Sequence, residues 1–144
     1  METFVTIERA LEIVCQSSIQ YTTESVSLGQ GYNRILSKDL QSKVDDPAFD
    51  NSAMDGWAVR SEDATRVEIG MTTAGEAPSE IGEGEAIRIM TGAPIPKGAN
   101  AIVMVEDGIN GKAHTNFIRK RGENLRQGET TLTSGQVMTP AAIS

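Results

Sequence analysis

The stretch that decides the fold is residues 85–98, which read EAIRIMTGAPIPKG. In its first half the apolar Ile87 and Ile89 alternate with the charged Arg88, which is typical of a half-buried strand. In its second half two prolines and two glycines exclude a helix and predict a rigid loop. Thr91 therefore lies where a strand passes into a loop, and Gly92 after it lets another group approach the backbone closely.

Strand signals continue beyond this stretch, and one helix signal precedes it. Ala101–Val105 is a continuous apolar run that predicts a buried strand, and Asn110-Gly111 is a hairpin turn signal. Near the N-terminus, Thr6 can cap a helix whose apolar positions recur at helical spacing, namely Ile7, Ala10, Leu11, Val14 and Cys15. We expect a mainly β (α+β) protein with an N-terminal α-helix, and Cys15 on the buried side of that helix.

Composition excludes several classes of protein. The chain has 144 residues and a net charge of −7, so it lacks the positive charge that nonspecific nucleic-acid binding requires. One cysteine excludes an internal disulfide and fits a reducing compartment. Neither a secretory signal nor a membrane-spanning apolar segment is visible in the sequence. We expect a soluble, cytoplasmic protein that binds neither nucleic acid nor membrane.

Carboxylates are concentrated in residues 45–60, which read DDPAFDNSAMDGWAVR. Four aspartates fall within eleven residues, and their oxygens are suitable ligands for Mg²⁺. The alternative is that Asp50-Asn51 and Asp55-Gly56 only form turns. The hydroxyl of Thr91 likewise has a functional and a structural interpretation: it could bind an oxyanion, or it could be part of a structural turn. Residue types alone leave both alternatives open.

The C-terminal part of the chain is basic. Residues 111–144 contain five bases and two acids, and four of the bases are Arg119, Lys120, Arg121 and Arg126. This cluster is either an anion site or a solvated strand face. The single histidine, His114, is expected in an exposed loop, and with Cys15 expected to be buried no Cys/His metal cluster can be assembled. At the end, Thr139 and Pro140 begin a helix too short to be stable alone, so we expect a fragment of a longer protein.

Several motifs taken together resemble one family. They are Pro47–Arg60, Arg88–Glu106, Arg119–Glu123 and Leu132–Ile143, and their order and spacing resemble the N-terminal part of the molybdopterin molybdenumtransferases, the MoeA and gephyrin E-domain family. The resemblance implies an elongated module of two β-rich domains, one inserted in the other. Domain I would comprise residues 1–43 and 122–144, and the inserted domain II would comprise residues 44–121.

The resemblance also implies a function. The family inserts molybdate into molybdopterin, releasing it from an adenylylated form, and works as a homodimer. Its active cleft lies between domain II of one subunit and a later domain of the other. This chain stops before that later domain, so we expect it to supply one wall of the cleft and to be inactive alone. Asp55 and Thr91 carry over as catalytic residues, and Asp55 is also the expected Mg²⁺ ligand. The expected substrate-binding residues are Asn51, Ser52, Gly92, Arg119, Arg121 and Asn124.

Three residues depart from the family pattern, and one of them is Asn100, where the family often has aspartate. Asn124 stands where the family usually has aspartate, which removes a carboxylate near the expected cleft. Trp57 replaces the commoner tyrosine. The departure at Asn124 keeps a second function open, in which the parent protein is a non-catalytic dimerising scaffold of the gephyrin type.

Overall fold

The computed structural model describes residues 4–17, 21–77 and 79–144. It is mainly β with an N-terminal helix, which confirms the predicted fold class. The α-helices are α1 (Ile7–Gln16) and α2 (Pro140–Ile143), and the 3₁₀ helices are η1 (Leu28–Gln30), η2 (Val105–Asp107) and η3 (Thr115–Phe117). The strands are β1 (Leu40–Gln41), β2 (Asn51–Ser52), β3 (Gly56–Val59), β4 (Val67–Thr72), β5 (Glu85–Ile89), β6 (Ala101–Met104), β7 (Ala113–His114), β8 (Ile118–Arg119) and β9 (Thr130–Leu132).

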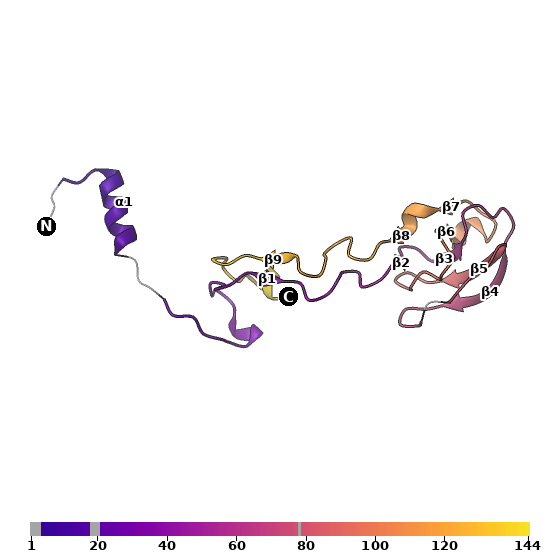
Figure 1. Cartoon of the computed structure of the whole chain (residues 1–144), viewed down its shortest axis with the longest axis horizontal. Helices are drawn as coiled ribbons and strands as arrows, with labels where there is room; N and C mark the ends of the chain where they lie inside the picture. The colour runs from indigo at the N-terminus through magenta and orange to yellow at the C-terminus, as the bar shows by residue number, and fades with distance from the viewer. Residues whose placement is uncertain (1–3, 18–20, 78) are drawn as a thin grey trace. The chain divides into compact units, whose positions relative to one another are not determined.

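The chain divides into two units, residues 1–38 with 134–144, and residues 39–133. Their residues can be followed by colour in Figure 1. The domain boundaries expected from the resemblance, at residues 44 and 121, stay a prediction. None of the helices within the described ranges has the length and apolarity needed to cross a bilayer.

Both predicted helix starts in the first unit are confirmed. The hydroxyl of Thr6 accepts a hydrogen bond from the backbone N–H of Arg9 at 3.3 Å, and Thr139 caps α2 in the same way. The prediction that Cys15 is buried is wrong, because no residue of α1 is buried and Cys15 is exposed. Helical periodicity shows which residues share a face, but it does not show whether another element packs against that face.

The second unit is built on a five-stranded sheet in the order β4-β5-β3-β6-β7. Strand β4 runs parallel to β5, and the other neighbours are antiparallel. The predicted strands at 85–90 and 101–105 and the hairpin around Asn110-Gly111 are thereby confirmed. Two short ladders, β1 with β9 and β2 with β8, accompany this sheet.

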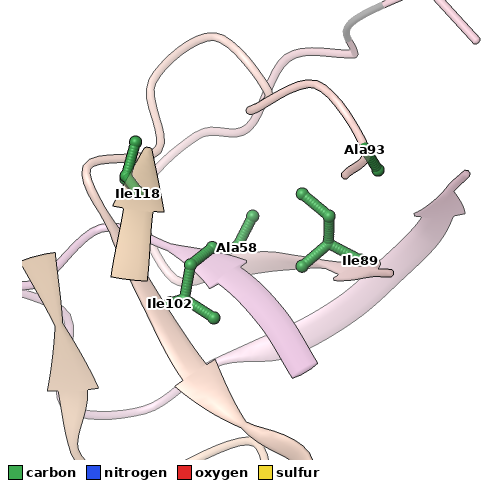
Figure 2. Packing of buried hydrophobic residues seen from close by; sticks show 5 residues of the cluster. All are labelled: Ala58, Ile89, Ala93, Ile102 and Ile118. Atoms are coloured by element: carbon green, nitrogen blue, oxygen red, sulfur yellow. The ribbon is translucent and has the colours of Figure 1, made fainter. Parts of the chain in front are cut away.

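Apolar side chains cover both faces of the sheet. One cluster consists of Ala58, Ile89, Ala93, Ile102 and Ile118 and is shown in Figure 2. The other consists of Val59, Ala86, Ala101 and Val103, with Trp57 packed at its margin. Because neighbouring residues of a strand point to opposite faces, Ala58 and Val59 belong to different clusters. The central strands β3, β5 and β6 are therefore packed on both sides, whereas the edge strand β4 is exposed except at Thr72.

Close backbone packing fixes the middle of this sheet. Gly56 begins β3, which lies between β5 and β6, and faces Ile89 on one side and Met104 on the other. A β-carbon at Gly56 would lie 1.9 Å from the carbonyl oxygen of Val103. Only glycine permits this approach.

The buried Arg66 links two segments of the same unit by hydrogen bonds. Arg66 is 6% exposed, and its guanidinium donates hydrogen bonds to the carbonyl oxygens of Ile109 and Gly111. Its backbone N–H donates to the side chain of Asn110 at 2.8 Å. Arg66 thus ties the start of β4 to the turn between β6 and β7.

Candidate functional site

The sequence-predicted catalytic residues, Asp55 and Thr91, contact each other directly. Gly56 and Ile89 face each other where β3 begins and β5 ends, so the residues just outside these strands meet. The backbone N–H and the hydroxyl of Thr91 both donate to Oδ1 of Asp55, at 2.7 and 2.8 Å. Both side chains are exposed. The pair is therefore an accessible polar group at one end of a rigid sheet.

The electrostatics of the pair favour an ionised carboxylate. The hydrogen bonds from the backbone N–H and the hydroxyl of Thr91 lower the pKa of Asp55, and the positive charge of Arg88 lowers it further. Asp55 is consequently an anion at neutral pH, with one oxygen occupied by Thr91. Such a group accepts hydrogen bonds from water or binds a cation, and it repels an anionic ligand that approaches it directly.

The surroundings of Asp55 fit Mg²⁺ only as a shared site. Within the described ranges, no group of three or more His, Cys, Asp or Glu residues could hold a metal ion. Mg²⁺ is often bound by only one or two carboxylates together with waters and phosphate oxygens of a ligand. The carboxylate of Asp55 fits that pattern as a single protein ligand, with the other positions filled by waters or by oxygens of a bound ligand.

Asn51 and Ser52 support the site from below the surface. Asn51 is 7% exposed and Ser52 is fully buried. The Ser52 hydroxyl donates to the carbonyl oxygen of Met54 at 2.6 Å, and the Asn51 amide donates to that of Phe49 at 3.4 Å. The backbone of Ser52 bonds the next loop, accepting from Gly92 at 2.8 Å and donating to Ala93 at 3.0 Å. These contacts favour a positioning role for both residues.

Gly92 gives the loop its shape. Its φ is +82°, a left-handed conformation that residues with a β-carbon adopt at a cost. A β-carbon there would meet nothing within 4 Å. Glycine is therefore required for the backbone conformation beside Thr91 and not for lack of space.

The basic cluster is neutralised by carboxylates. Arg119 donates to Glu123 at 2.8 Å, and Lys120 donates to Asp50 at 2.8 Å. The Arg121 side chain donates to Asp45. Among the described residues these contacts form a separate group from Asp55 and Thr91, although β2 links the two through the pairing of Asn51 with Arg119. The geometry thus favours a structural role for Arg119 and Arg121 over anion binding.

The sequence of the chain matches a known protein family. A family model described as "MoeA N-terminal region (domain I and II)" matches residues 5–144. The chain belongs to this family. The resemblance found in the motifs is thereby confirmed, and MoeA proteins provide the comparison for the rest of the site.

Relatives and solved structures cover nearly the whole chain. A molybdopterin molybdenumtransferase of Synechococcus elongatus is 40% identical over 157 aligned residues, which cover 95% of this chain and 38% of that protein. One of Bacillus subtilis (strain 168) is 34% identical and covers 94% of the chain. The crystal structure of a molybdopterin biosynthesis MoeA protein from Pyrococcus horikoshii OT3 has a TM-score of 0.84 and 32% identity, covering 98% of this chain and 42% of that one. The chain spans about 38% of the length of the first of these relatives.

The side chain of Asn124 makes hydrogen bonds to two of its neighbours. Its amide nitrogen donates to the carboxylate of Asp46 at 2.9 Å, and its amide oxygen accepts from Arg119 at 3.2 Å. An aspartate at position 124 would face Asp46 with a second negative charge. The asparagine therefore connects residues 45–50 to residues 119–124 without that repulsion.

Three carboxylates of this region make stability depend on pH. The backbone N–H of Gln127 and the side chain of Arg121 lower the pKa of Asp45, Lys120 lowers that of Asp50, and Arg119 lowers that of Glu123. A carboxyl with a lower pKa in the folded than in the unfolded state stabilises the fold above the unfolded value, about 4. That stabilisation is lost as the pH falls through the folded value.

We expect the urea midpoint of unfolding to decrease as the pH is lowered from about 6 to about 3.5. Asp45→Asn should lower the midpoint at pH 6 and make the further decrease in acid smaller, because one titrating group has been removed. Asp107→Asn, at an exposed position of η2, is the control and should behave like the parent chain. Equal acid sensitivity of the Asp45→Asn variant and the parent chain would contradict this assignment.

Sequence reasoning missed one feature of the site, the contact of Arg88 with Trp57. The guanidinium carbon of Arg88 lies 4.5 Å from the centroid of the Trp57 ring. The alternation of Ile87, Arg88 and Ile89 was a usable signal, because it placed Arg88 on the face opposite the isoleucines. The partner on that face could not be read from the strand itself.

Proposed function

We propose that this chain is the N-terminal part of a molybdopterin molybdenumtransferase, which inserts molybdate into adenylylated molybdopterin. The proposal is supported by the family, by relatives with that name and by one observation at the site. That observation is the exposed Asp55–Thr91 pair, formed by the two segments with the sharpest family resemblance. In this proposal the pair belongs to one wall of the active cleft.

The chemistry of the substrates explains what such a wall would do. Molybdate, a phosphate-bearing pterin and a nucleotide are all anionic, so the ionised Asp55 cannot bind them directly. Asp55 instead orients a water or serves as the protein ligand of a Mg²⁺, and Thr91 fixes the direction of its carboxylate. When bound there, Mg²⁺ would neutralise phosphate oxygens during cleavage of the phosphoanhydride.

The remaining parts of the proposal concern the whole protein. The chain covers well under half the length of its relatives. As the family resemblance implies, the other wall of the cleft would come from a later domain of a partner subunit in a homodimer. The chain alone would then be inactive. The domain boundaries at 44 and 121 and the cytoplasmic location belong to the same proposal.

The test is an assay of the full-length protein with adenylylated molybdopterin, in which the release of AMP is measured with and without molybdate. We expect release that depends on molybdate, and none from residues 1–144 alone. A full-length protein that binds no pterin and releases no AMP would overturn the proposal.

A dimerising scaffold without catalysis is the second candidate, and Asn124 is the observation that favours it. The Asn124 side chain forms hydrogen bonds with Asp46 and Arg119, and it supplies no carboxylate. Light scattering of the full-length protein, combined with the same assay, separates the two functions. A dimer without turnover supports the scaffold, whereas turnover excludes it.

A further inference from the structure

The guanidinium of Arg88 is held in a fixed place on the surface of the sheet. Arg88 on β5 faces Trp57 on β3 across the antiparallel ladder, and the two side chains form a cation–π contact. The indole N–H of Trp57 donates to the carboxylate of Glu68 on β4 at 2.6 Å. Three adjacent strands thus orient the ring and, through the ring, the guanidinium.

The guanidinium of Arg88 has N–H donors that are not engaged by a carboxylate, unlike those of two other arginines of this unit. The side chains of Arg119 and Arg121 each donate to a carboxylate. Among the residues that the structure describes, the Arg88 side chain makes no hydrogen bond or ion pair besides its contact with the Trp57 ring, which leaves its N–H donors for another partner. It is also partly buried, and a charge partly withdrawn from water gains more from an ionic partner than a fully exposed one.

The position of Arg88 relates it to the Asp55–Thr91 pair. Arg88 is paired with Trp57 in the ladder of β5 and β3, and Asp55 lies in the bend directly before β3. After the two hydrogen bonds from Thr91, the charge of Arg88 is the next favourable influence that lowers the pKa of Asp55. The guanidinium therefore lies within electrostatic reach of the carboxylate.

We propose that Arg88 binds a tetrahedral oxyanion, either molybdate or a phosphate group, beside the Asp55–Thr91 pair. The planar array of guanidinium donors matches two oxygens of such an anion, and the contact with Trp57 reduces the side-chain entropy lost on binding. The choice of anion rests on the proposed function. Because Asp55 and Glu68 are negative, binding to this chain is expected to be weak.

The chain contains a built-in reporter for the test, because Trp57 is its only tryptophan. The fluorescence of Trp57 is titrated with molybdate, inorganic phosphate and AMP at constant ionic strength, and calorimetry provides a readout independent of the ring. We expect a saturable response. Arg88→Gln should weaken binding about tenfold, as expected for the loss of a charge-assisted hydrogen bond. Arg88→Lys keeps the charge but loses the planar donors, so its affinity should lie between that of the parent chain and that of Arg88→Gln.

Two further variants test the location of the anion. Glu68→Gln removes a neighbouring negative charge while its amide oxygen can still accept from Trp57, so it should tighten binding several-fold. Lys112→Gln changes the net charge as Arg88→Gln does, at an exposed residue directly before β7, and should leave binding unchanged. Circular dichroism confirms that each variant is folded.

The outcomes separate the possible ligands and the possible errors. A response to molybdate alone identifies molybdate, whereas responses to phosphate and AMP identify a phosphate group, and both support the proposal. The proposal is overturned by no saturable response to any anion, by a response to AMP alone, or by unchanged affinity in Arg88→Gln or Glu68→Gln. Anion binding here together with no AMP release by the full-length protein would overturn the proposed function and leave the Arg88 site standing.

Discussion

Gly56→Ala is expected to unfold the five-stranded sheet or to destabilise it by about 3 kcal/mol or more, the upper end of the range for overpacking. The new methyl group would lie 1.9 Å from the carbonyl oxygen of Val103, which is a backbone atom and cannot rotate away. Strands β3 and β6 would have to separate, and the ladder that pairs Gly56–Val59 with Ala101–Met104 would be lost. Urea unfolding followed by Trp57 fluorescence measures the change.

Gly70→Ala is the matched control for this experiment. Gly70 lies on strand β4, and a β-carbon there would meet nothing within 4 Å. We therefore expect Gly70→Ala to change the free energy of unfolding by no more than about 0.5 kcal/mol, as is usual for surface changes. If Gly56→Ala were as stable as Gly70→Ala, the close packing of β3 on β6 would be wrong.

Asp55→Asn in the full-length protein is expected to reduce molybdate-dependent AMP release about 100-fold or more, a loss typical of removing a group that acts on the reacting centre. Asparagine keeps the size of the side chain and still accepts hydrogen bonds from Thr91, so the fold should survive. It loses the negative charge that would orient water or bind Mg²⁺. Initial rates at saturating substrate and the urea midpoint of the same samples measure both effects.

The control for Asp55→Asn is Asp107→Asn, which removes the same charge at an exposed position of η2. It should retain the parent rate. Normal turnover in the Asp55→Asn protein would show that the Asp55–Thr91 contact only shapes a turn. Loss of folding in that variant would lead to the same conclusion, because the rate could then fall without any catalytic role.

The elements that sequence predicted best are those specified by local patterns. The strand at 85–89 follows from alternation, and the strand at 101–104 from a short apolar run. Helices α1 and α2 begin directly after Thr6 and Thr139, because the side chains of these two N-cap residues accept hydrogen bonds from backbone N–H groups of the first turn. Local rules of this kind need no knowledge of what lies across the sheet. They also fixed the fold class.

The site was harder to predict because it depends on pairings between distant segments. That Asp55 and Thr91 belong to one site was anticipated only from the family resemblance, since nothing in either segment specifies that β3 pairs with β5. Serine is mostly exposed in proteins, so the burial of Ser52 could not be expected from its type. Arg121 has Asp45 as its partner, 76 positions away in the sequence, and no local signal connects them.

The short strand β2 has a consequence for how distant substitutions should act. Asn51 is bridged to Pro94 on one side and paired with Arg119 on the other, while Ser52 holds Gly92 by its backbone. The loop that bears Thr91 and the ion pairs around Asp50 and Asp45 are thus mechanically coupled, through β2 and through the bond that the backbone N–H of Ile95 donates to the carbonyl oxygen of Asp50 at 3.0 Å. A substitution that weakens the ion pairs would change the orientation of the Thr91 hydroxyl, although the substituted residue contacts no ligand. A slower reaction in such a variant would then reflect the changed orientation of Thr91 and not the loss of a contact with the ligand.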